Sequence, residues 1–162
     1  MSGHVAPHGA AYSTVLVAHV LAAVVAVAAA SASVVYALAA GRGPKAPSAR
    51  SVTRFFRPGP NLAGRALWAV PLLGGALLAM SRGAYDLEDG FVLWGLGLWA
   101  AALAVGEGLW WPSERRLKAE VAGSWGAGDP GRLRRLVAAV AASAAAVCAL
   151  VLAAMVVMVT KP

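Results

Sequence analysis

Two charged residues lie within or beside long apolar stretches, where a charge costs several kcal/mol and is usually retained for a purpose. Glu107 is the one acid in the apolar run 91–111, near its end, and Arg65 opens the apolar run before it. Antiparallel helices would bring these two residues to the same level. We therefore expect Arg65 and Glu107 to form a structural ion pair, with two alternatives: a contact of Glu107 to a partner subunit, and proton or ligand handling.

Histidine is the second residue type here that can do chemistry, as a hydrogen-bonding group or as a metal or haem ligand. His19 lies inside the first apolar run, and we favour a hydrogen bond to a neighbouring helix for it. His4 and His8 precede that run and would share the outer face with three carboxylates, Asp86, Glu88 and Asp89. A b-type haem usually needs two axial ligands, and His19 is the one histidine within an apolar run. We therefore predict no cofactor, and keep His4, His8 and His19 as weak metal-ligand candidates.

Four long apolar runs must position these side chains. The run 91–111 would be about 31 Å long as a helix, which matches the hydrocarbon core of a bilayer. We expect membrane-spanning helices at 12–40, 62–80, 91–111 and 136–160. Long continuous apolar runs argue against strands, so the predicted fold is all-α: a single domain over 1–162, built as a polytopic four-transmembrane-helix bundle.

The cations predict the orientation of this bundle. Six lie in 41–65 and six in 112–135, whereas the rest of the chain holds two, Arg82 and Lys161. By the positive-inside rule, the basic loops 41–61 and 112–135 are cytoplasmic and both termini face outward. An Arg-, Ala- and Gly-rich composition is compatible with a GC-rich bacterial genome. We therefore expect a multi-pass protein of the bacterial inner (plasma) membrane.

The two basic loops also predict contacts with lipid. A short helix from Ser48 that ends before Pro58 would hold Phe55 and Phe56 as anchors in the headgroup layer, between Arg54 and Arg57. A second short surface helix, 113–121, would carry Arg115, Arg116 and Lys118. In a membrane protein, the net charge of +7 indicates anionic lipids as partners and not nucleic acid.

Small residues in the run 91–111 predict close helix packing. Gly97 and Ala101 are four residues apart, as are Ala102 and Gly106, and this spacing lets another backbone approach. Such surfaces would serve the bundle itself or a larger complex.

The composition and the motifs argue against catalysis. The chain is 60% hydrophobic and 13% charged, and it contains no GxSxG, HExxH, P-loop or Rossmann pattern. The single Cys148 lies in an apolar run and is interpreted as a packing residue. We therefore expect the protein not to be an enzyme.

Three short motifs carry a resemblance to a known family: AHVLAAV at 18–24, Arg65 followed by PLLGG at 71–75, and WWPSERRL at 110–117. With these motifs the chain resembles a family of predicted bacterial four-helix integral membrane proteins, distantly similar to the membrane domain of copper-resistance D proteins. The resemblance implies the four-span fold, leaves the function open, and brings His19 into consideration as a copper ligand.

These observations together predict a non-catalytic accessory or stabilising subunit of a larger membrane complex, such as a transporter or respiratory assembly. Its partners would be larger integral membrane subunits and anionic lipids. The alternative is a small membrane carrier or sensor of metal, haem or protons that uses His19 and the outer His, Asp and Glu side chains.

Overall fold

The computed structural model describes residues 9–57, 59, 62–81, 83–85 and 87–160, and no strand occurs among them. The helices are α1 (Ala10–Ala40), α2 (Ala49–Phe55), α3 (Ala66–Met80), α4 (Gly90–Val105), the π-helical turn η1 (Gly106–Trp110), α5 (Trp111–Gly123) and α6 (Pro130–Thr160). Since α4, η1 and α5 follow each other without a break, they form one helix over Gly90–Gly123. The expectation of an all-helical chain is confirmed for the described residues.

Three helices in the described part of the chain are long and apolar enough to cross a membrane: Ala10–Ala40, Gly90–Gly123 and Pro130–Thr160. The expected span 62–80 corresponds to α3, which has 15 residues and is shorter than a usual span. The membrane character of the chain is thus supported by three helices.

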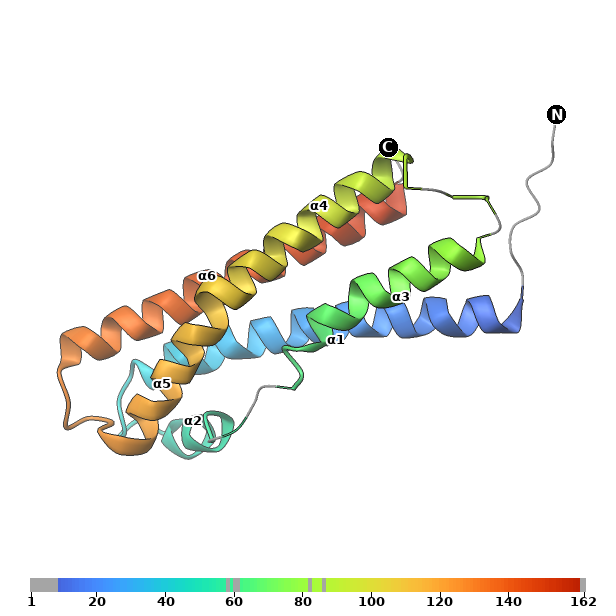
Figure 1. Cartoon of the computed structure of the whole chain (residues 1–162). Helices are drawn as coiled ribbons and strands as arrows, with labels where there is room; N and C mark the ends of the chain where they lie inside the picture. The colour runs from blue at the N-terminus through green and yellow to red at the C-terminus, as the bar shows by residue number, and fades with distance from the viewer. Residues whose placement is uncertain (1–8, 58, 60–61, 82, 86, 161–162) are drawn as a thin grey trace.

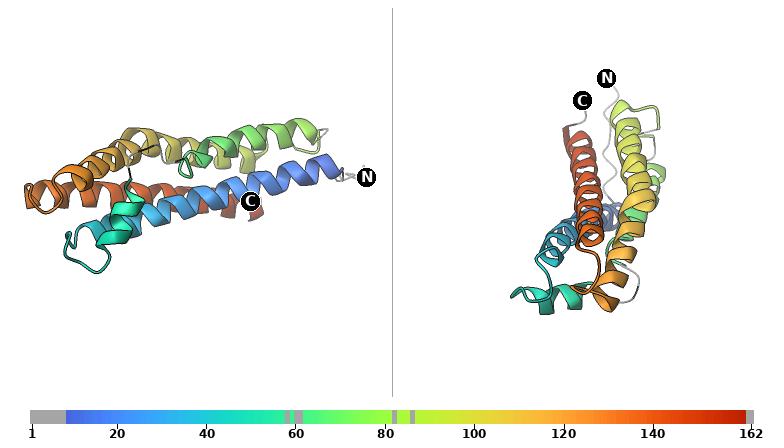
Figure 2. Two further views of the ribbon diagram at one scale, coloured as in Figure 1. Left: turned by 90° about the horizontal axis from the view of Figure 1, so that it is seen from below. Right: turned by 90° about the vertical axis from the view of Figure 1, so that its left-hand side faces the viewer.

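The helices are arranged around α1 and α6, which lie side by side (Figures 1 and 2). On this pair, α4 packs against α6 and α3 packs against α1. The end of α1, the short helix α2, α5 and the start of α6 gather at one end of the molecule (Figure 1). We call it the basic end because α2, α5 and the turns beside them carry most of the cations of the chain. The start of α1, the end of α3, the start of α4 and the end of α6 lie at the opposite end.

Alanine dominates the packing between α1 and α6. The buried residues of α1 include Ala23, Ala26, Ala30 and Ala37, and they share the core with valines and small residues of α6, among them Val140, Ala144 and Val147. Small side chains let two helix backbones approach closely, which is how helices associate in lipid. Large apolar side chains such as Leu72 and Trp94 instead point outward, as expected of a surface that faces acyl chains.

The helix boundaries differ from the expected ones at three places. Residues 62–65 form turns with hydrogen bonds such as Arg65 N to Leu62 O (3.1 Å), so that α3 begins at Ala66. The third helix does not stop at 111: Pro112 lies just after the π-helical turn η1, where the regular hydrogen-bond ladder is already interrupted, and the helix continues as α5. The predicted surface helix 113–121 is therefore the continuation of a long helix.

The last helix begins at Pro130 and not at 136. Asp129 caps it: Oδ1 accepts a hydrogen bond from Gly131 N (2.8 Å) and Oδ2 accepts one from Arg132 N (3.1 Å). An aspartate cap followed by a proline in the first turn is a favourable start for a helix.

Candidate functional site

Arg65 and Glu107 lie together where α3 begins and α4 ends. Arg65 Nη1 is 3.0 Å from Glu107 Oε1, and the same oxygen accepts a hydrogen bond from Trp68 Nε1 (3.2 Å). The guanidinium of Arg65 also lies 4.1 Å from the centre of the Trp111 ring, a cation–π contact. Both charged side chains are nearly half exposed, at 43% and 46%. The pair therefore joins α3 to the Gly90–Gly123 helix at the surface of the bundle.

Glu107 lies in the π-helical turn η1, where the helix is widened by one residue. Next to it, Trp110 and Trp111 are both buried, and neither indole N–H has a hydrogen-bond partner in the described part of the chain. Gly106 is buried too, and a Cβ there would meet Trp111 and Leu67 at ordinary contact distances. This turn thus joins the apolar part of the long helix to its polar part at the basic end.

Reversing one charge of the Arg65–Glu107 pair tests its role. We expect Arg65→Glu to place two carboxylates side by side, to remove the cation–π contact with Trp111, and to destabilise the protein by about 1 kcal/mol, since the pair is half exposed. The double exchange Arg65→Glu with Glu107→Arg should recover part of this loss, because it restores the ion pair but not the contact with Trp111. Thermal unfolding in detergent measures both. Equal stability of the single and double variants would contradict a structural ion pair.

His19 connects α1 to α3. Its Nδ1 donates a hydrogen bond to Val70 O (2.9 Å), since a carbonyl oxygen only accepts. Gly74 makes room for the ring, because a Cβ there would lie 3.3 Å from His19 Cε1. The expected hydrogen bond between His19 and a neighbouring helix is thus present. His4, His8 and Asp86 lie outside the described residues, and the described chain holds no group of three His, Cys, Asp or Glu side chains placed to bind a metal ion.

A third connection joins α3 to α4, and it was not predicted from the sequence. Pro71 has no N–H, so it cannot donate to the carbonyl of Leu67 one helical turn earlier. The indole of Trp99 on α4 supplies that hydrogen bond: Nε1 lies 2.9 Å from Leu67 O. Trp99 also packs edge-on against Trp68. A proline inside an apolar helix signals a carbonyl that needs another donor, but it does not identify the donor.

The two four-spaced pairs of small residues lie on different faces of the long helix. Ala102 and Gly106 are buried inside the bundle, whereas Gly97 and Ala101 are exposed. Gly95 was not singled out from the sequence, yet it is buried, and a Cβ there would collide with Met158 Cε of α6. A side chain at 95 would therefore require the flexible end of Met158 to move, while the Gly97 and Ala101 face remains free.

The basic end contains a buried carboxylate that the sequence analysis did not identify. Glu114 is 2% exposed, and it accepts a hydrogen bond from Ser33 Oγ of α1 (3.2 Å to Oε2). Lys118, one turn further along α5, lies 2.9 Å from Glu114 Oε1 and also donates to Gly59 O (3.2 Å). This cluster joins α5, α1 and the loop after α2.

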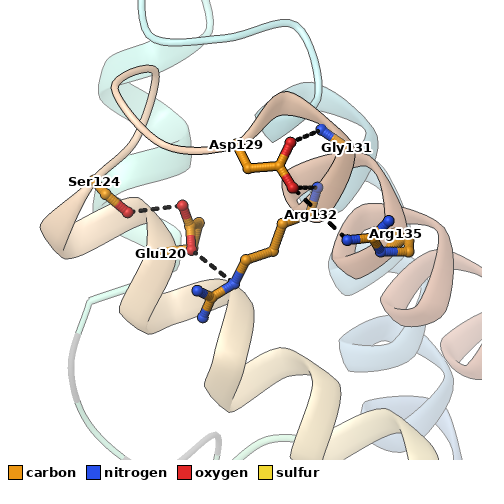
Figure 3. A network of polar contacts seen from close by, with 6 residues as sticks. All are labelled: Glu120, Ser124, Asp129, Gly131, Arg132 and Arg135. Atoms are coloured by element: carbon orange, nitrogen blue, oxygen red, sulfur yellow. Dashed lines mark hydrogen bonds and ion pairs between the residues drawn. The ribbon is translucent and has the colours of Figure 1, made fainter.

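A second buried carboxylate joins α5 to α6. Glu120 accepts a hydrogen bond from Ser124 Oγ (2.7 Å to Oε1), and its Oε2 lies 3.4 Å from Arg132 Nε (Figure 3). Asp129 at the start of α6 pairs with Arg135 (3.7 Å) in the same network. These contacts close the turn between α5 and α6.

Three residues expected to face lipid have other surroundings. Phe56 is 1% exposed, and Phe55 stacks on Tyr36 of α1 with ring centres 4.2 Å apart, so neither aromatic side chain is a free anchor. Lys118 is turned inward toward Glu114. Phe56 is thus buried against the bundle, and Phe55 and Lys118 are partly buried. The expected exposure does hold for Arg54, Arg57, Arg115 and Arg116.

Comparisons with known proteins found no matching family model, no matching curated protein and no matching solved structure. The resemblance to the copper-resistance D membrane domain therefore stays a prediction.

Proposed function

We propose that this protein is a non-catalytic accessory or stabilising subunit of a larger bacterial membrane complex, such as a transporter or respiratory assembly. The observation that carries the proposal is the free face of α4. Gly97 and Ala101 are exposed there, and a Cβ at Gly97 would meet no other atom within 4 Å. Ala104 and Gly108, further along the helix, are exposed as well.

The same helix supports the choice of a helical partner. Helices in lipid gain little from apolar burial, and their association depends on close contact between backbones at small residues. On its inner side the long helix uses Ala102 and Gly106 in the packing of the bundle. A second four-spaced pair on the outer side suits a helix from another subunit.

The proposal includes a fourth span and an orientation. As a helix, α3 is about 22 Å long, and a short span is accommodated by local thinning of the bilayer. The turns at 62–65 lengthen it at the basic end. With α3 crossing, the basic loops 41–61 and 112–135 face the cytoplasm of the inner membrane, and both termini face outward.

Filling the free face of α4 tests the proposal. We expect Gly97→Leu with Ala101→Leu to leave the bundle folded, because the side chains enter open space, and to abolish copurification of partner subunits, because the backbones can no longer approach. The matched control is Ala145→Leu with Ala149→Leu, two exposed residues four apart on α6. Loss of partners in both variants, or in neither, would contradict a specific role for α4.

The measurement is a purification from native membranes in mild detergent, with mass spectrometry of copurifying chains and elemental analysis of the same sample. Recovery of larger membrane subunits in stoichiometric amounts is the expected result. Recovery of the chain alone, with about one bound copper, iron or haem, would overturn the proposal. That outcome would favour the carrier or sensor, with His19 as the first ligand to replace.

A further inference from the structure

The short helix α2 has one face fixed to the bundle. Val52 and Phe56 are fully buried on that face, and Phe55 stacks on Tyr36 near the end of α1 with an angle of 14° between the rings. The helix is therefore held in a defined position at the basic end, with its aromatic residues inward.

The other side of α2 and the residues just after it carry three arginines, which we call the α2 arginines. Arg50 and Arg54 lie on the helix, Arg57 follows just after its end, and together with Thr53 they line an open hollow of about 490 Å³. The hydroxyl of Thr53 donates to backbone carbonyls of its own helix, Ala49 O (3.2 Å) and Arg50 O (3.0 Å). The donors available to a ligand are therefore the guanidinium groups.

These arginines differ from the paired cations at the same end of the molecule. Lys118, Arg132 and Arg135 lie against Glu114, Glu120 and Asp129, respectively. None of the three α2 arginines forms an ion pair within the described ranges, and the segment 41–65 contains no acid. Their charge is thus available to an external anion.

We propose that this hollow, the α2 arginine site, binds the phosphate group of an anionic lipid headgroup. Guanidinium groups bind phosphate oxygens through paired, charge-assisted hydrogen bonds, and three of them surround one opening. A lipid suits the site better than a free anion because Val35 and Leu38, on the turn of α1 that carries Tyr36, are exposed. Such aliphatic side chains can contact the acyl chains of a lipid whose headgroup lies on α2.

This inference does not depend on the accessory role of the protein. It requires only that the chain lies in a membrane with the basic end at the headgroup layer. An isolated subunit, or a carrier of metal, would use the same lipid site.

The test measures lipid binding to the purified, delipidated full chain in neutral detergent. Native mass spectrometry counts bound phosphatidylglycerol and phosphatidylcholine during a titration. We expect phosphatidylglycerol to be preferred, and Arg50→Gln, Arg54→Gln and Arg57→Gln together to weaken its binding by about tenfold or more. The control is Arg115→Gln, Arg116→Gln and Arg134→Gln, which removes the same charge from exposed positions outside α2, and it should weaken binding by less than about threefold.

Other outcomes would overturn the proposal of a lipid-binding site on α2. Equal weakening by both triple variants would show attraction to diffuse charge and no defined site. Displacement of the lipid by millimolar inorganic phosphate would assign the site to a free anion. If the glutamine variant does not fold, the three arginines are replaced by lysine: weaker binding by a folded protein supports the site, and unchanged binding refutes it.

Discussion

Lys118→Met is expected to lower the free energy of unfolding by about 3 kcal/mol. The ammonium group of Lys118 lies 2.9 Å from a Glu114 oxygen, and the Glu114 side chain is 3% exposed. Removing the cation leaves a carboxylate in a site that water barely reaches, and methionine keeps the bulk of the side chain. Unfolding titrations in mixed micelles, followed by tryptophan fluorescence, measure the change.

Two further variants separate the buried charge from other effects of the substitution. Adding Glu114→Gln to Lys118→Met removes the charge and should recover about half of the loss, because a neutral amide costs less to bury. Arg115→Met, at an exposed neighbour on the same helix, should change stability by no more than about 0.5 kcal/mol. If Lys118→Met had an effect as small as Arg115→Met, the pair would not stabilise the basic end.

Trp99→Phe is expected to cost about 2 kcal/mol, because it leaves Leu67 O without the donor that Pro71 cannot provide. Phenylalanine keeps an aromatic ring against Trp68, so the lost indole N–H dominates the change. The measurement is the same unfolding titration, followed by circular dichroism, since the substitution alters the fluorescence.

The prediction is tested most directly by measuring the cost of Trp99→Phe in a chain that also carries Pro71→Ala. Alanine at 71 has an N–H that can donate to Leu67 O within the helix. Trp99→Phe should then cost much less in the Pro71→Ala background than in the original chain. An equal cost in both backgrounds would mean that Trp99 stabilises the protein by packing alone.

Much of the helical architecture could be predicted from local composition. The long apolar runs predict helices, although the last of them begins at Pro130 and not at 136. Arg65 and Glu107 could be paired because each lies near the basic end of its own run. The helices follow from the composition of single segments, and the ion pair follows from the place of each charged residue within its own run.

The interpretation of the polar segments was less successful. The segment 113–121 was expected to be a separate surface helix, but it continues α4 and buries Glu114 and Leu117. Phe56 and Lys118 were expected to face lipid, but both side chains lie against the protein. A short amphipathic helix has the same pattern whether its apolar face meets a membrane or a bundle, so the sequence could not distinguish the two.

The sequence by itself determined that the chain is helical, where its long apolar segments lie, and that the segments between them differ strongly in charge. Each of these features follows from the kinds of residue in one continuous segment. The tertiary structure alone decided which helix faces are free: on the long helix, Ala102 is buried and Gly97 is exposed. It also decided which residues meet between helices, such as Trp99 of α4, whose indole donates a hydrogen bond to Leu67 O of α3. These features depend on how each helix is rotated about its axis, and contacts between residues far apart in the chain set that rotation.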